Sequence, residues 1–146
     1  MAGFTNKGKY RLLETLRGVS LPSNMYVALC TSAAAPTQDT DTLSEMTQIG
    51  TSTGYTSGGI SLNMDTTDWS AIVEDDTNDD SEITIKELVW TASGGTLGAA
   101  RYAVLTDDNA TEDDREIWAY YDLGEDKSAS SGQTLSLSGF KLKLAE

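Results

Sequence analysis

Residues 100–106 read ARYAVLT, and residues 116–123 read EIWAYYDL. The acidic segment DDNATEDD at 107–114 separates these runs and is typical of a solvated turn. Apolar residues alternate along the second run, where Ile117 and Ala119 fall on one face of an extended chain. Two β-type runs joined by a short polar segment predict an antiparallel hairpin.

Further short strands are expected on both sides of this hairpin. In the run 25–30 both alternating sets of residues are apolar, which indicates a strand buried on both faces. Residues 60–63 predict another short strand. Residues 83–91 and 135–144 each predict a strand as well. In both, the apolar residues shift partway from odd-numbered to even-numbered positions, which we call a parity change.

The parity changes suggest local irregularities within otherwise extended segments. One lies at Lys86 and Glu87, where a β-bulge is expected, and the other lies beside Gly139. Several short strands with Ser-, Thr- and Gly-rich connections predict an all-β fold, an antiparallel β-sandwich or jelly roll with one short N-terminal helix.

The helix is predicted over residues 5–18. Its apolar positions recur every three to four residues and are Tyr10, Leu12, Leu13 and Leu16. Thr5 or Asn6 can accept a backbone N–H as the N-cap, and Gly18 supplies a left-handed stop. We expect this helix to pack at the edge of the β domain or to reach outward.

The chain is expected to form one compact unit with an N-terminal appendage. Residues 1–22 predict a basic helix and its connector, and residues 23–146 predict a single β domain. Within that domain the Ser/Thr-rich segment 31–58 is a long loop, with one helical turn expected near Leu43 to Met46. Loops of this length in compact domains usually form binding surfaces or ordered interface arms.

Composition narrows the range of functions. The 146 residues contain 23 acidic and 10 basic side chains and no histidine, for a net charge of −13. An acidic surface repels nucleic acid, and the absence of histidine removes Ser-His-Asp and Cys-His catalysis. No secretory signal or membrane span is expected, so the chain is predicted to be synthesised in a cytoplasm, with Cys30 reduced. The composition predicts a soluble acidic domain that is not an enzyme, and it specifies no function beyond that.

Charge is distributed unevenly along the chain. The first 18 residues hold four basic side chains and one acidic one, a net of +3, which leaves −16 on the rest. A basic helix on an acidic body is expected to dock on an acidic neighbour, although it can equally offset the charge of its own body. The candidate partner-binding residues are Lys7, Lys9, Tyr10, Arg11, Leu13, Arg17 and Trp69, the last in a polar loop where exposure is expected.

One acidic segment copies part of a calcium-binding loop. Asp76, Asn78, Asp80 and Glu87 occupy the first, third, fifth and twelfth positions of an EF-hand loop. Ser81 stands where such a loop requires glycine, and no flanking helices are expected. The segment is therefore either a looser Ca²⁺ site or a solvated acidic loop that protects strand edges. No other cofactor is expected.

Several stretches together resemble small virion proteins of tailed double-stranded DNA bacteriophages. The resemblance covers nearly the whole chain but consists of strands and turns rather than a catalytic motif. The stretches that carry it are FTNKGK at 4–9, NMYVALCTS at 24–32, GYTSGGI at 54–60, KELVWTA at 86–92, ARYAVL at 100–105 and SGQTL at 131–135.

The resemblance implies a virion structural protein, either a head decoration protein or a tail-associated one, and the leading expectation is a capsid decoration or cement protein on the outside of the head. It implies the major capsid protein and copies of the chain itself as partners, with a homotrimer expected, and neither nucleic acid nor membrane. The alternative is a tail fibre or baseplate component that contacts the host. A carbohydrate-binding module or enzyme that uses Trp69 and loop carboxylates is a remoter alternative.

Overall fold

The computed structural model describes residues 2–145 and shows an all-β sandwich with one short α-helix. Within these residues the strands form three antiparallel sheets. The largest has the order β1-β8-β7-β2-β3 and consists of β1 (Ala2–Phe4), β8 (Ile117–Ala129), β7 (Leu97–Thr106), β2 (Asn24–Cys30) and β3 (Ile60–Asn63).

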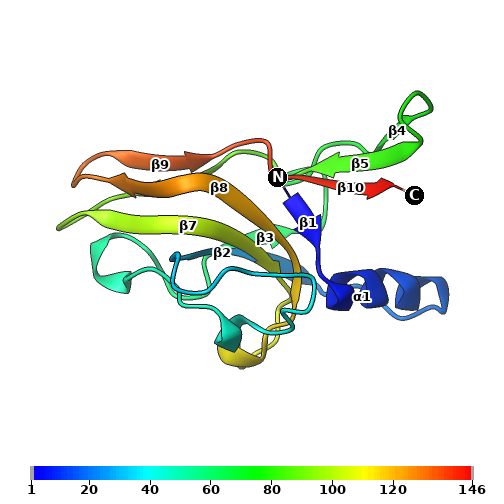
Figure 1. Cartoon of the computed structure of the whole chain (residues 1–146), viewed down its shortest axis with the longest axis horizontal. Coiled ribbons are helices and arrows are strands. Elements are labelled where there is room, and N and C mark those ends of the chain that lie inside the picture. The colour runs from blue at the N-terminus through cyan, green and yellow to red at the C-terminus, as the bar shows by residue number, and fades with distance from the viewer. Residues whose placement is uncertain (1, 146) are drawn as a thin grey trace.

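The predicted hairpin forms the centre of this sheet. Strands β7 and β8 pair antiparallel, with Ala103 opposite Tyr121 and Leu105 opposite Ala119. Both strands are longer than the runs that predicted them, and they extend together to one end of the molecule (Figure 1). One residue of β8, Trp118, is left without a partner because the register shifts there. Such a bulge redirects a side chain.

The two runs with parity changes form one kinked ribbon rather than two bulged strands. Their strands are β5 (Asp80–Thr84), β6 (Leu88–Thr91), β9 (Thr134–Leu137) and β10 (Lys141–Ala145). Strand β6 pairs with β9, and β5 pairs with β10 in the same antiparallel register, continued by a hydrogen bond from Ile85 N to Phe140 O of 2.9 Å. Gly139, at a φ of +73°, lies at the kink.

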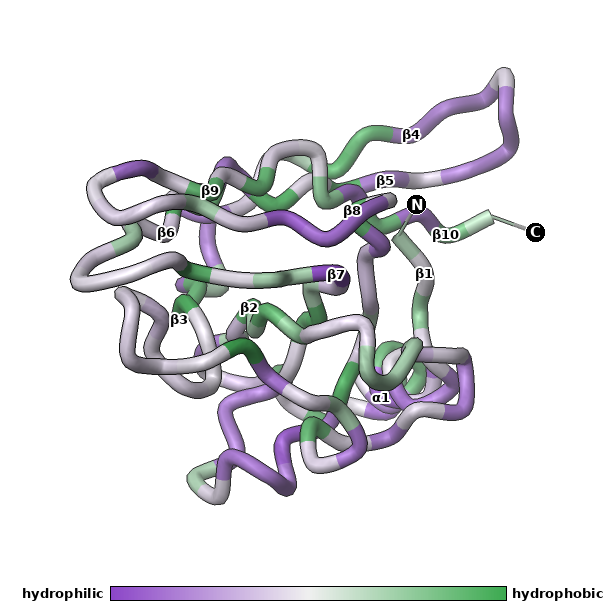
Figure 2. The backbone as a smooth tube through the Cα atoms, turned by 60° about the vertical axis from the view of Figure 1, so that its left-hand side comes forward, coloured by the Kyte–Doolittle hydropathy of each residue, from purple (hydrophilic) through white to green (hydrophobic). Residues whose placement is uncertain are grey.

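A short third strand extends the far end of this ribbon. Strand β4 (Val73–Asp75) pairs with β5 and was not predicted, because its sequence shows no alternation. Figure 2 shows the β4–β5 hairpin projecting from the body, with hydrophilic residues at its tip. Strand β1 was also missed, since it is only three residues long and contains Gly3.

Strand β2 is buried on both faces, as its sequence predicted. Met25 and Leu29 belong to the main core between the large sheet and the ribbon, together with Trp90 and other ribbon residues. Ala28 and Cys30 point the other way, into a smaller core. Strand β2 therefore separates two apolar layers.

The Ser/Thr-rich segment 31–58 covers that second layer. Leu43 and Met46 pack there against the outer face of the sheet, and Leu43 begins a 3-10 turn, Leu43–Glu45, where a helical turn was expected. A second 3-10 turn spans Thr51–Thr53. The segment is an ordered cover of its own sheet and leaves no extended arm.

Candidate interaction surface

Helix α1 (Asn6–Leu16) is fixed to the edge of the large sheet by its first turn. The hydroxyl of buried Thr5 accepts the Gly8 N–H at 2.9 Å and donates to the Ile117 carbonyl at 2.5 Å. A Cβ atom at Gly8 would lie 2.0 Å from the Trp118 carbonyl oxygen, so only glycine permits this approach. The predicted N-cap Thr5 is thus confirmed, and it anchors as well as caps.

Two of the four basic residues near the N-terminus are used within the molecule. Arg11 forms a two-pronged hydrogen-bonded ion pair with Glu116, at 2.6 and 2.7 Å, and a further contact with Glu14. These hydrogen bonds raise the pKa of Arg11 above its ordinary value. Lys7 lies 3.9 Å from the same Glu116 carboxylate. These two residues offset the charge of their own body, the alternative that the sequence left open.

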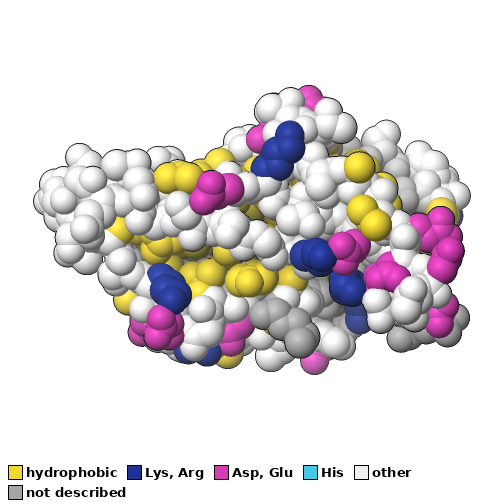
Figure 3. Space-filling view, turned by 90° about the horizontal axis from the view of Figure 1, so that it is seen from above, with side chains coloured by type: hydrophobic (Ala, Val, Ile, Leu, Met, Phe, Trp, Pro, Cys, Tyr) yellow, Lys and Arg dark blue, Asp and Glu magenta, His cyan; other side chains and the backbone are white. Residues whose placement is uncertain are grey.

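Most basic residues of the body are likewise paired with acidic neighbours. Arg101 contacts Asp122 at 2.7 Å, and Lys143 contacts buried Asp80 at 2.5 Å. Figure 3 shows lysine and arginine side chains beside acidic ones on the face it presents, not gathered in one basic patch. This pattern offers no phosphate-binding stripe on that face.

The outer face of α1 remains free in the described part of the chain. Tyr10, Leu13 and Leu16 expose 54%, 64% and 83% of their surface. Lys9 and Arg17 are exposed on the same side and form no ion pair within residues 2–145. We call these five residues the outer helix face, and an apolar stripe of this kind normally requires a cover.

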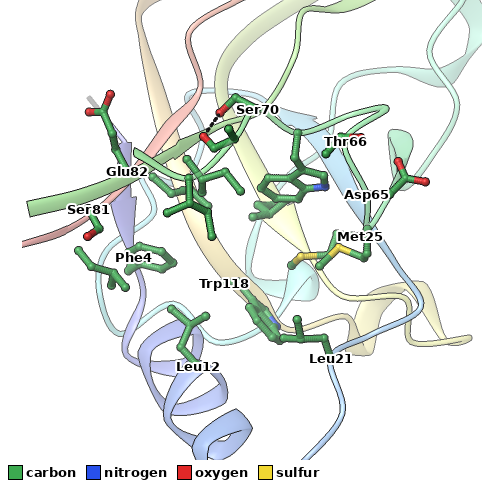
Figure 4. A pocket seen from close by; sticks show the side chains of 18 residues that line it. Phe4, Leu12, Leu21, Met25, Asp65, Thr66, Ser70, Ser81, Glu82 and Trp118 are labelled. Atoms are coloured by element: carbon green, nitrogen blue, oxygen red, sulfur yellow. Dashed lines mark hydrogen bonds between the residues drawn. The ribbon is translucent and has the colours of Figure 1, made fainter. Parts of the chain in front are cut away.

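Beside the helix lies an open apolar groove with a volume of about 560 Å³ (Figure 4). Phe4 of β1, Leu12 of α1 and Trp118 of β8 form one wall, and Met25 lies at its side. The loop 64–72 and strands β5 and β10 complete the lining. The apolar rim is exposed and consists of Leu21, Met64, Ile72 and Leu144.

Local polar contacts hold the groove-lining loop in shape. Asp68 accepts hydrogen bonds from the backbone and side chain of Asn63 at 2.7 and 2.9 Å. Asp65 caps a turn at Thr67 N, and hydrogen bonds from Thr67 hold the pKa of Asp65 below its ordinary value. Asp65 is therefore an ionised carboxylate on the groove at neutral pH.

Trp69 corrects one sequence expectation. Its ring was expected to be exposed, but only 7% of the residue is accessible, and its indole N–H donates to the Asn63 carbonyl at 2.9 Å. The backbone forms a bridge to Ile85, which draws the ring into the core despite its polar sequence neighbours. Trp69 lines the groove from inside and offers no exposed platform for a sugar.

The structure places the candidate calcium ligands in different elements, and a looser Ca²⁺ site there stays a prediction. Asp76 and Asn78 lie in the hairpin turn between β4 and β5, whereas Asp80 opens β5 and binds Lys143. Glu87 lies beyond the ribbon kink. Among residues 2–145 no three His, Cys, Asp or Glu side chains gather to hold a metal ion.

Sequence reasoning missed the groove itself. Leu12 carried a signal as part of the helical stripe, but Leu21 and Ile72 belong to short apolar stretches that show neither a helical nor a strand period. They meet only because the connector and the 64–72 loop converge on the same end of the sandwich.

The chain matches no protein-family model, no curated protein and no solved structure. Within residues 2–145 no helix combines the length and apolar character needed to cross a membrane.

Proposed function

We propose that this protein is a structural component of a tailed-phage virion that attaches to the outside of the head as a decoration protein. The sequence resemblance supports this assignment. The structural observation that carries it is the outer helix face together with the adjoining groove, which we call the docking surface. An exposed apolar surface flanked by charge is typical of a protein-binding site.

The rest of the molecule is consistent with such a role. The acidic body would be repelled by packaged DNA, which favours a position on the exterior of the shell. Thr5 and Arg11 fix α1 to the sandwich, so the backbone of the outer helix face is already in place before binding. On this proposal the chain binds neighbours and transforms no substrate.

Cementing follows from mass action. A protein that binds neighbouring sites on an assembled shell, and not dispersed subunits, stabilises the closed particle by its binding free energy. The docking surface would make contacts with virion neighbours, which are the major capsid protein and other copies of this chain.

The test uses phage particles from which this protein has been deleted. Purified protein is added back, unbound material is removed, and the bound copy number per major capsid protein is measured by quantitative mass spectrometry. We expect binding at an abundance comparable with the capsid protein and a rise in the temperature at which particles release DNA.

Two other results would decide against head decoration. A few copies per wild-type particle would assign the protein to the tail fibre or baseplate instead. Absence from purified wild-type particles would refute a virion role altogether.

A further inference from the structure

The docking surface contains two apolar parts that lack a cover, and they differ in shape. The outer helix face is convex, with side chains that project from one side of a helix about 16 Å long. The groove is concave and apolar, and its lining includes buried Met25 and Leu105. Both parts are present once in every copy of the chain.

We infer that the groove receives helix α1 of a second copy, so that the protein self-associates. This inference names the partner of the docking surface and rests on the proposed function only in that both use this surface. A helix laid with its apolar face in a hydrophobic groove is a common mode of recognition, with anchors spaced three to four residues apart. Tyr10, Leu13 and Leu16 have that spacing.

Charge favours a copy of the same chain as the occupant. Residues 19–146 carry −16, so contacts between two bodies are repulsive, whereas Lys9 and Arg17 form no ion pair within residues 2–145 and are attracted to an acidic body. Lys9 and Arg17 are exposed beside Leu13, and ionised Asp65 lies on the groove. A helix seated there brings its unpaired cations to the groove that the Asp65 carboxylate lines.

The placement of helix and groove allows the assembly to close. Leu12 of α1 and Leu21 of the connector form part of the groove wall, so the helix and the groove lie side by side in one copy. A two-fold rotation can then place each helix in the groove of its partner, and a different rotation gives a ring. Either arrangement covers both apolar parts in every copy.

Directed cross-linking tests the contact itself. Two variants that each add one cysteine to native Cys30, L16C on the outer helix face and I72C on the groove rim, are mixed under mild oxidation. Both positions are exposed, while Cys30 is buried with a pKa raised by desolvation to about 12, so the native thiol does not interfere. L16C mixed with V89C is the control, because Val89 is exposed on β6 away from the groove.

We expect a disulfide that links L16C to I72C between copies, identified by peptide mass spectrometry, at a yield well above that of the control. Analytical ultracentrifugation of the unmodified protein is expected to show a dimer or trimer. The double variant L13D/L16D should weaken the association at least about tenfold, whereas V89D should leave it unchanged.

A monomer at all concentrations, with cross-linking no better than the control, would overturn the inference. If such a monomer still binds particles, the docking surface serves the capsid protein, and the proposed function stands without self-association. If the oligomer forms but does not bind particles, the self-association stands and the proposed function fails. The two failures are therefore separable.

Discussion

Gly8 governs how closely the helix approaches the sheet. The Thr5 hydroxyl bridges the first turn of α1 to strand β8, and this short bridge is possible only because nothing projects from Gly8 toward the Trp118 carbonyl. One small residue therefore determines where the outer helix face is presented. Glycine also lowers the intrinsic stability of the helix, so its presence here reflects packing rather than propensity.

We expect Gly8→Ala to destabilise the protein by about 1–3 kcal/mol, because the added methyl group overlaps the Trp118 carbonyl. Urea unfolding followed by tryptophan fluorescence measures the change. Gly50→Ala is the matched control, since a Cβ there meets no atom within 4 Å, and its effect should stay within about 0.5 kcal/mol. Equal stability of the two variants would contradict the close approach.

At the scale of elements, the segment 31–58 acts as a second layer without forming a sheet. Ile49 N donates to the Leu29 carbonyl at 3.0 Å, and the Tyr55 hydroxyl accepts from Leu29 N at 3.1 Å and donates to Gln48 at 2.7 Å. These bonds tie the segment to the edge of β2. Leu43 and Met46 then complete the smaller core, while Ile49 and Tyr55 join the main core, and this burial explains why so polar a loop is ordered.

Leu43→Ala should cost about 2–5 kcal/mol, because Leu43 is fully buried in the smaller core and the truncation leaves a cavity. The same variant should speed alkylation of Cys30, which lies in that core. Ser44→Ala, at the exposed neighbouring position, should change neither measurement. Stability and alkylation unchanged in both variants would mean that the segment does not cover the sheet.

At the scale of the whole molecule, the cations that stabilise the fold are different residues from those that remain available to a partner. The cations near the N-terminus divide into Arg11 and Lys7, which hold the helix to Glu116, and Lys9 and Arg17, which are free within the described residues. The first pair maintains the fold, and the second pair is available to a partner. A basic segment on a strongly acidic chain can thus serve both purposes at once.

We expect the double variant K9E/R17E to reduce both self-association and attachment to particles, with its stability within about 0.5 kcal/mol of the parent. Association of the parent should weaken as salt rises, because these charges are exposed and screened. Arg11→Gln should instead lower the midpoint of urea unfolding, since it removes two hydrogen bonds to Glu116. Undiminished binding by K9E/R17E would exclude an electrostatic role for the outer helix face.

Local patterns were sufficient for most elements of the fold. The central hairpin, the double burial of β2 and the capped helix each follow from a period or a cap that lies within about ten neighbouring residues. The parity changes at Lys86 and Gly139 were real as well, but local pattern could not distinguish two bulges from one kink shared by paired strands. That distinction depends on the partner strand, about 50 residues away.

The sequence alone thus accounts for the all-β class, the short N-terminal helix and the basic N-terminal segment on an acidic chain. Backbone preference and charge are properties of each residue and do not depend on its neighbours in space. Folding in three dimensions accounts for the burial of Trp69, the separation of the candidate calcium ligands over different elements, the pairing of Arg11 and the groove. Each of these depends on which distant segments meet, and that is settled by the free energy of packing the whole chain. Whether a side chain lies in the core, at a rim or on the free surface depends on which distant segment packs over it.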